Sequence, residues 1–153
     1  MEKTIDSITY STNKDLLDIR LIHAYLCNES YWAKGITIER VENFIEHSLC
    51  LGAYSEHGQV AFGRLITDYT SFGYLADVFV LGDFRKRGIS KHLTESVIDM
   101  ARELKLKRIL LSTSDAHGLY SKFGFTELQN PEKMMELNLK DEGLKTDHVP
   151  KNS

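Results

Sequence analysis

The feature that most constrains the fold of this chain is a strand–turn–helix unit within residues 72–104. Residues 72–81 are a short aromatic and β-branched run that ends at Gly82-Asp83, which is typical of a buried strand. Over residues 89–104, apolar side chains recur every three or four positions with charged residues between them, as on one face of a helix. The chain must therefore turn sharply between a strand and an amphipathic helix.

The turn between these two elements is rich in positive charge. Arg85, Lys86 and Arg87 stand where the helix begins, although a helix N-terminus carries partial positive charge and favours acidic residues. The amides of a first helical turn, together with Gly88 and the three cations, form a site for an anion, and a diphosphate fits it best. The alternative is that Asp83 caps the helix and the cations are merely solvated.

This turn resembles the acetyl-CoA-binding motif of the GCN5-related N-acetyltransferases (GNAT), usually written Arg/Gln-x-x-Gly-x-Gly/Ala. Here it reads Arg85-x-x-Gly88-x-Ser90, with serine in place of the last glycine or alanine. A second motif, Leu-Tyr-Ser-Lys-Phe-Gly-Phe at residues 119–125, resembles the Tyr-x-x-Phe-Gly-Phe of that family. Residues 30–35, together with residues 75–80 and 115–120, are also similar to those of a subgroup of small bacterial acetyltransferases.

Hydrophobic patterns predict an α/β (α+β) protein, and their order is similar to that of the GNAT fold. That fold is a mixed, mostly antiparallel central sheet flanked by helices, in the order β-α-α-β-β-β-α-β-α-β-β. Short turns favour antiparallel pairing, whereas the crossover helix lets the strand that follows it run parallel to the strand before it. The strands are expected at residues 5–11, 49–55, 59–68, 72–81, 108–113, 125–128 and 134–139, and the helices at residues 14–27, 37–48, 89–104 and 115–124.

Length and composition indicate one domain over residues 1–140, followed by a polar, aperiodic and disordered tail at residues 141–153. The net charge of −3 argues against a nucleic-acid partner. No apolar run approaches membrane-spanning length, so we expect a cytoplasmic protein without a membrane partner. Cys27 and Cys50 are expected to be reduced and packed, and the histidines lack the spacing of metal ligands.

The resemblance implies that acetyl-CoA is the co-substrate and that the main chain of one strand holds its pantetheine arm. Phe79 and Val80 occupy that strand position. The residues expected to bind the rest of the donor are Arg85, Lys86, Arg87, Gly88, Ile89, Ser90 and Lys91.

Transfer to an amine also needs proton transfers. A lysine-type amine is mostly protonated at neutral pH, so the acceptor benefits from a base. Asp77 is the candidate base because a lone acid in an apolar strand is costly unless it is used or paired. The alternative is that Asp77 makes a hydrogen bond or an ion pair. Asp68 and Glu29 are further candidates.

Tyr120 is the candidate acid. A phenol and a thiol ordinarily titrate within about two pH units of each other, so a tyrosine can protonate a departing thiolate. The resemblance implies this role for Tyr120, and the alternative is that its ring only packs on Phe123 and Phe125. His117 either orients the phenol or faces solvent.

Tyr31 and the single tryptophan of the chain, Trp32, lie in a connection between two helices. They form either a packed aromatic cluster or the wall of a substrate site that suits a cationic acceptor. The predicted function is direct acetyl transfer to a primary amine of a small molecule, peptide or protein. A non-catalytic acyl-CoA-binding or sensing module is the alternative, and monomeric and homodimeric states both stay open.

Overall fold

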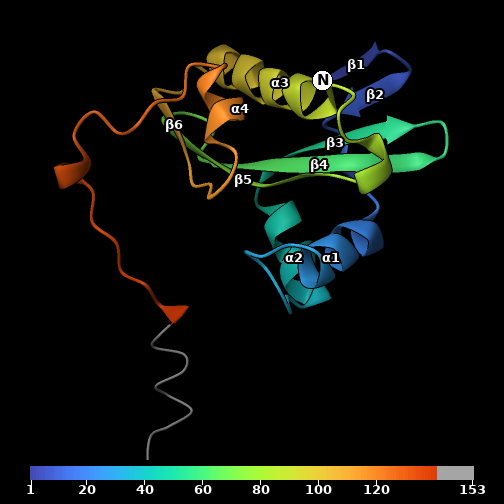
Figure 1. Ribbon diagram of the computed structural model, residues 1–153, viewed down its shortest axis with the longest axis horizontal. Coiled ribbons are helices and arrows are strands. Elements are labelled where there is room, and N and C mark those ends of the chain that lie inside the picture. The colour runs from blue at the N-terminus through green and yellow to red at the C-terminus, as the bar shows by residue number, and fades with distance from the viewer. Residues whose placement is uncertain (141–153) are drawn as a thin grey trace, which may run out of the picture. The chain divides into compact units, whose positions relative to one another are not determined.

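A computed structural model of the protein describes residues 1–140 and places a six-stranded sheet at its centre (Figure 1). The strands stand in chain order, from β1 to β6. All neighbours are antiparallel except β5 and β6, which are parallel. The predicted mixed α/β class is confirmed. The strands are β1 (Glu2–Ile5), β2 (Ile8–Ser11), β3 (Leu49–Ser55), β4 (Gly58–Thr67), β5 (Phe72–Val80) and β6 (Arg108–Leu111).

Three helices cover the two faces of this sheet: α1 (Ile19–Asn28) and α2 (Ile38–Glu46) on one face and α3 (Ile89–Glu103) on the other (Figure 1). The core under α1 and α2 is one buried cluster of apolar side chains. Its members are Ile22, Leu26, Val41, Ile45, Cys50, Phe62 and Phe79. On the opposite face α3 contacts β3, β4 and β5 and carries the chain from β5 to β6. This crossover explains why only β5 and β6 run parallel.

The first strand is wrong as predicted, because residues 2–11 form a hairpin, β1 and β2, rather than one strand. Asp6 and Ser7 connect the two strands with φ angles of 49° and 66°. Positive φ at both central residues is the geometry of a tight hairpin turn. Asp-Ser is a weak sequence signal for such a turn compared with Asn-Gly, so the hairpin was missed.

The first helix begins later than expected. Lys14–Leu16 form a short 3-10 turn, η1, and α1 begins after Asp18, whose side chain accepts a hydrogen bond from the Leu21 amide at 3.0 Å. α2 begins as predicted at its N-cap, Thr37, whose hydroxyl accepts a hydrogen bond from the Arg40 amide at 3.4 Å. An aspartate or threonine at this position satisfies an amide that has no acceptor within its helix.

The described chain forms two compact units, residues 1–119 and the residues from Tyr120 onward. The short helix α4 (His117–Ser121) ends close to Gly124, which has a φ of 93°. The prediction of one domain over residues 1–140 stays a prediction. The predicted disordered tail at residues 141–153 lies outside the described residues.

The expected final hairpin, over residues 125–128 and 134–139, is wrong. The structure forms no strand at residues 125–139 and places a 3-10 turn, η3 (Pro131–Lys133), at the expected bend. Met135 and Leu137 are 96% and 75% exposed, so the alternating apolar side chains have no surface to pack against. Alternation alone does not make a strand without a partner edge. Within residues 1–140, no helix combines the length and apolarity needed to cross a membrane.

Candidate active site

A β-bulge interrupts the pairing of β4 with β5 and shapes the centre of the site. Phe62 pairs with Phe79 and Arg64 pairs with Ala76, so one residue of β4 faces two residues of β5. One of these two is Asp77, whose φ of 54° lies in the left-handed region. Side chains alternate between the faces of a regular strand, and a bulge breaks that alternation. The bulge therefore re-aims the Asp77 side chain.

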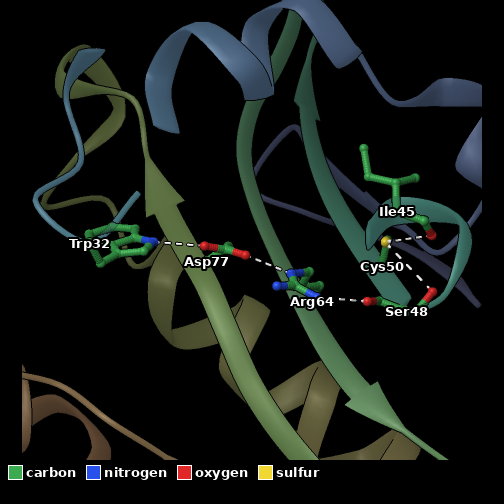
Figure 2. A network of polar contacts seen from close by, with 6 residues as sticks. All are labelled: Trp32, Ile45, Ser48, Cys50, Arg64 and Asp77. Atoms are coloured by element: carbon green, nitrogen blue, oxygen red, sulfur yellow. Dashed lines mark hydrogen bonds and ion pairs between the residues drawn. The ribbon is translucent and has the colours of Figure 1, made fainter. Parts of the chain in front are cut away.

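Asp77 points toward Arg64 and Trp32 (Figure 2). The Arg64 Nε atom donates to Asp77 Oδ2 at 2.6 Å, and the Trp32 Nε1 atom donates to Asp77 Oδ1 at 2.7 Å. The side chains of Asp77 and Arg64 are only 8% and 15% exposed. The ion-pair alternative for Asp77 is therefore what the structure shows. A charge-assisted pair of this kind is short and strongly oriented.

Arg64 is held from two further directions. Its Nη1 atom donates to the Ser48 hydroxyl at 3.0 Å (Figure 2). Its guanidinium lies 4.0 Å from the centre of the Phe44 ring. These contacts tie the ion pair to α2 and to the start of β3. Sequence reasoning missed Arg64. The signal was present, because Arg64 is a lone cation within the apolar run Val60–Ile66 and such a charge must be paired.

The loop that carries the two aromatics, residues 30–35, is tightly bonded to α1. The buried Ser30 hydroxyl donates to the Leu26 carbonyl at 2.6 Å and accepts from the Ala33 amide at 3.0 Å. The Gly35 amide donates to the Cys27 carbonyl at 3.1 Å. The loop is therefore anchored at both ends, and its two aromatic side chains project from a fixed backbone.

Tyr31 and Trp32 meet edge to face, with their ring centres 5.0 Å apart, and both are exposed. The Tyr31 hydroxyl accepts a hydrogen bond from the Ser114 amide at 3.4 Å, just after β6. The two rings pack together and still face solvent, and their role as the wall of a substrate site stays a prediction. An exposed aromatic pair fixed by polar contacts offers a surface to a ligand.

The end of β5 is braced by Arg85. Its Nε atom donates to the Val80 carbonyl at 3.1 Å, and its Nη2 atom donates to the Tyr25 hydroxyl at 3.0 Å. The Tyr25 ring stacks on Phe79 with ring centres 4.0 Å apart. Arg85, predicted only as an anion ligand, therefore also holds β5 against α1. Tyr25 was not singled out from the sequence, because the pattern of α1 marks it only as an apolar-face residue.

α3 begins at Gly88, which has a φ of 77° and offers no side chain to cap the helix. The alternative that Asp83 caps this helix is wrong, since Asp83 lies in a separate 3-10 turn, η2 (Gly82–Phe84). The Arg87 guanidinium lies 4.9 Å from the centre of the Phe84 ring. The amides of Ile89, Ser90 and Lys91 have no acceptor within the helix, and the first amide that has one is that of His92, which donates to the Gly88 carbonyl at 3.1 Å. This end of α3 thus presents backbone donors beside exposed cations.

The remaining residues of the predicted donor site lie on the first turn of α3. Ile89 is buried, and the Ser90 carbonyl accepts a hydrogen bond from the Thr94 hydroxyl at 2.8 Å. Lys91 reaches toward Glu95, with 4.0 Å between Nζ and the carboxylate. Ser90 at the divergent motif position is compatible with a regular helix.

Tyr120 belongs to the second compact unit. It is buried, and its ring meets Phe125 edge to face with the ring centres 5.8 Å apart. Its backbone carbonyl accepts hydrogen bonds from the Phe123 amide at 3.0 Å and the Phe125 amide at 3.3 Å. The Tyr-x-x-Phe-Gly-Phe motif therefore has a definite local structure around this tyrosine. His117, at the start of α4, is exposed.

Asp68 and Glu29 are the two further candidates for the base. Asp68 accepts hydrogen bonds from the Ser71 hydroxyl and from the amides of residues 70–72 in the β4–β5 turn. These bonds hold the pKa of the Asp68 carboxyl well below its usual range, and the bond from the Ser71 hydroxyl has the largest effect. The Glu29 amide donates to the Tyr25 carbonyl at the end of α1. Neither carboxylate lies in the network around Asp77.

Cys50, at the edge of that network, is a buried thiol. Its Sγ atom donates to the Ile45 and Ser48 carbonyls at 3.6 and 3.7 Å (Figure 2). Burial raises the pKa of Cys50 to about 11, so the thiol stays protonated at neutral pH. The expectation of a packed core thiol is confirmed for Cys50, while Cys27 is only half-buried.

Comparison with known proteins identifies the class. The family model described as the acetyltransferase (GNAT) family matches residues 20–125, which is more than half of the chain. The chain therefore belongs to the GNAT family of acetyltransferases. Enzymes of this family transfer an acetyl group from acetyl-CoA to an acceptor.

Individual relatives agree with this assignment. A GNAT-family protein of Xanthomonas campestris pv. campestris, provisionally described as an acetyltransferase, is 45% identical, with a TM-score of 0.84 over 88% of this chain and 95% of that one. A protein of Gibberella zeae, also provisionally named an acetyltransferase, is 26% identical over 73% of this chain and 75% of its own length. A predicted acetyltransferase of Clostridium acetobutylicum, solved with acetyl-CoA, shares the fold at 16% identity, with a TM-score of 0.68 over 92% of this chain and 98% of that one.

Proposed function

We propose that this acetyltransferase moves the acetyl group of acetyl-CoA directly to a primary amine of a small molecule, peptide or protein. The observation that carries the proposal is the start of α3, where Gly88 leaves the helix without a side-chain cap beside Lys86 and Arg87. Backbone amides and cations together suit a diphosphate. The family assignment supports acetyl-CoA as its source.

The residues of the donor site divide into two groups in this proposal. The amides of residues 88–91, with Lys86, Arg87 and Lys91, supply donors and charge to the diphosphate. Arg85 is exposed and braces the loop through the Val80 carbonyl and the Tyr25 hydroxyl. The pantetheine arm lies along the main chain of Phe79 and Val80, just beyond the bulge in β5.

The reaction in this proposal is a single transfer without an acyl-enzyme. The neutral amine attacks the thioester carbonyl, the C–N bond forms, the C–S bond breaks, and the thiolate of CoA takes up a proton. Tyr120 donates that proton, in keeping with its motif. Cys50, the buried thiol of the network, does not serve as a nucleophile, because burial keeps it protonated. The proton that the attacking amine loses passes to solvent water, and the Tyr120 phenolate takes a proton back from solvent, so that amine and acetyl-CoA give amide and CoA.

The acceptor lies against Tyr31 and Trp32, the two exposed aromatics of the loop after α1. Aromatic faces attract cations, and an indole face does so most strongly. The net charge of −3 also favours a cationic acceptor over an anionic one. The expected acceptors are therefore amines that carry positive charge.

The test has a donor arm and an acceptor arm. In a thermal-shift panel of acetyl-CoA, CoA, ATP and NAD, we expect acetyl-CoA at 100 times its Kd to stabilise the protein by about 2.7 kcal/mol. An amine panel is then followed by release of free thiol and by mass spectrometry of the product. Thiol release that depends on the amine, with a gain of one acetyl group, is expected. Stabilisation by ATP or NAD without acetyl-CoA, or thiol release without amine, would overturn the proposal.

A further inference from the structure

The bulge in β5 brings Asp77 to Trp32, and the hydrogen bond between them takes no part in the acetyl-transfer steps proposed above. Leu75 is paired with Leu65, and Phe79 is paired with Phe62 and packs under α1 and α2. Regular alternation would put residues 75, 77 and 79 on one face of the sheet. The extra residue of the bulge shifts this alternation after Leu75. Asp77 therefore lies on the face of α1 and α2 with Phe79 and meets Trp32 in the loop that joins those two helices.

Both carboxylate oxygens of Asp77 are already engaged. Oδ2 accepts from Arg64 at 2.6 Å, and Oδ1 accepts from the Trp32 indole at 2.7 Å. The side chain is 8% exposed. A general base must lie within hydrogen-bond reach of the proton that it removes, directly or through one water. A buried carboxylate between two donors is better placed to orient them than to collect a proton from a substrate.

The chain of contacts runs in one direction, from a fixed core to an exposed ring. Arg64 is held by the ring of Phe44 and by Ser48. Figure 2 shows how Arg64, bonded to Ser48, contacts Asp77, which in turn accepts from the indole N–H of Trp32. Trp32 itself is 37% exposed, so part of the indole remains available to solvent. Hydrogen bonding to a carboxylate polarises the indole toward greater electron density in the ring, which strengthens its attraction for a cation.

We infer that Asp77 is a positioning residue, which holds the Trp32 indole as the wall of the acceptor site for amines carrying a second positive charge. The inference rests on the proposed function for its substrate, but the contact itself is independent of activity. The second cation lies over the indole face while the first amine is acetylated. Asp77 then acts on the acceptor through Trp32, and it does not take the proton of the amine.

The contact is measured through the emission of Trp32, which is the only tryptophan in the sequence. In Asp77→Ala the indole loses its acceptor, and we expect a red-shifted emission maximum and a quenching constant for acrylamide raised about two-fold. Asp99→Ala is the matched control, because Asp99 is an exposed acid paired with Arg102 on α3. Equal emission in wild type, Asp77→Ala and Asp99→Ala would overturn the inference.

Kinetics distinguish a positioning residue from a base. We expect Trp32→Phe, which leaves the buried ion pair intact, to raise the KM for 1,4-diaminobutane about five-fold and to leave that for 1-aminobutane unchanged. Asp77→Asn is expected to raise the KM for 1,4-diaminobutane in the same way, while kcat stays within about three-fold of wild type and the pH profile is unchanged. In the double variant, the KM for the diamine is expected to be no higher than in either single variant.

Other outcomes contradict the inference. A loss of kcat of about 100-fold or more in Asp77→Asn, with normal Trp32 emission and a lost acid limb in the pH profile, would make Asp77 the base. If Trp32→Phe changed the KM for the diamine and for the monoamine equally, the claim that a second cation lies over the indole would be wrong. If no amine is acetylated by the wild type, the proposed function fails, while the emission experiment still decides whether Asp77 positions Trp32.

Discussion

At the scale of single residues, the buried pair of Arg64 and Asp77 is the most demanding feature of this protein. Two charges have been taken out of water, and the left-handed φ of 54° at Asp77 adds backbone strain of about 1–3 kcal/mol. The hydrogen bonds from Trp32 and to Ser48 offset part of this cost. Replacing one partner is therefore expected to destabilise the fold mainly because the other charge stays buried without a counter-charge, and less because the attraction within the pair is lost.

Arg64→Met tests that expectation. It leaves the Asp77 carboxylate buried without a counter-charge, and we expect the free energy of unfolding to fall by about 3–5 kcal/mol at neutral pH. The measurement is urea unfolding. Arg102→Met, which breaks the exposed pair with Asp99, is the control and should cost less than about 1 kcal/mol. A double variant, Arg64→Met with Asp77→Asn, should be more stable than Arg64→Met alone; if it is less stable, the account of an uncompensated charge is wrong.

Tyr120→Phe tests the proposed acid. Loss of the hydroxyl should lower kcat by about 100-fold, because general acid catalysis contributes at least that much, while acetyl-CoA still raises the melting temperature as in wild type. Tyr69→Phe, on the exposed β4–β5 turn, is the control and should keep full activity. An unchanged kcat in Tyr120→Phe would remove this residue from the proposed reaction.

At the scale of elements, the start of α3 differs from the starts of α1 and α2. Those two helices use Asp18 and Thr37 as side-chain caps, whereas α3 follows Gly88 without one. A capping carboxylate at this place would compete with a bound anion for the same amides. The strand–turn–helix unit thus lacks a side-chain cap at the start of α3, and the backbone amides there stay available to a ligand.

Gly88→Ala separates the backbone cost of this turn from its part in binding. Alanine with a φ of 77° should cost about 1 kcal/mol of unfolding free energy. Gly35→Ala is a closely matched control, since Gly35 has the same φ of 77° and an added Cβ would meet nothing within 4 Å. Only Gly88→Ala should also raise the KM for acetyl-CoA, by about ten-fold, because the added Cβ hinders the close approach of the diphosphate to the amides of this turn and weakens about one hydrogen bond to a charged group. Equal KM values in both variants would place the diphosphate elsewhere.

At the scale of the whole molecule, alkaline pH should destabilise the fold, because several buried thiol and phenol groups are kept protonated in the folded state. Burial raises the pKa of Cys50 from its ordinary value of 9.0 to about 11, and that of Tyr10 and Tyr54 from 10.0 to about 12. When the pKa of a group is higher in the folded state, its contribution to stability is fully present at pH values below its ordinary pKa. That contribution is lost as pH rises through the pKa of the folded state, because the group in the unfolded chain gives up its proton first.

Cys50→Ala tests this linkage. In wild type, the free energy of unfolding should fall between pH 9 and 11, by at most about 3 kcal/mol from Cys50. The variant starts from a lower stability because of the cavity, but its unfolding free energy should change less over that window. Cys27→Ala is the control and should show the slope of wild type. Urea titrations at half-unit steps of pH measure both slopes, and equal slopes in Cys50→Ala and wild type would contradict the assignment.

Much of the architecture could be predicted because it depends on local patterns. The apolar period marks α3, Thr37 marks the start of α2, and the turn at residues 82–88 marks the end of β5. The errors arose where a local pattern was not sufficient. Residues 134–139 alternate like a strand but lack a partner edge in the structure, and Asp6-Ser7 turn a hairpin without the usual sequence signal.

The sequence by itself determined the family, the sheet class and the charged turn before α3, because periodicity and motifs are properties of neighbouring residues. Only the tertiary structure decided that Asp77 faces Trp32 and Arg64 and that Arg85 braces Tyr25. The physical reason is the bulge between β4 and β5, which depends on how two strands pair and reverses the alternation that a sequence pattern assumes.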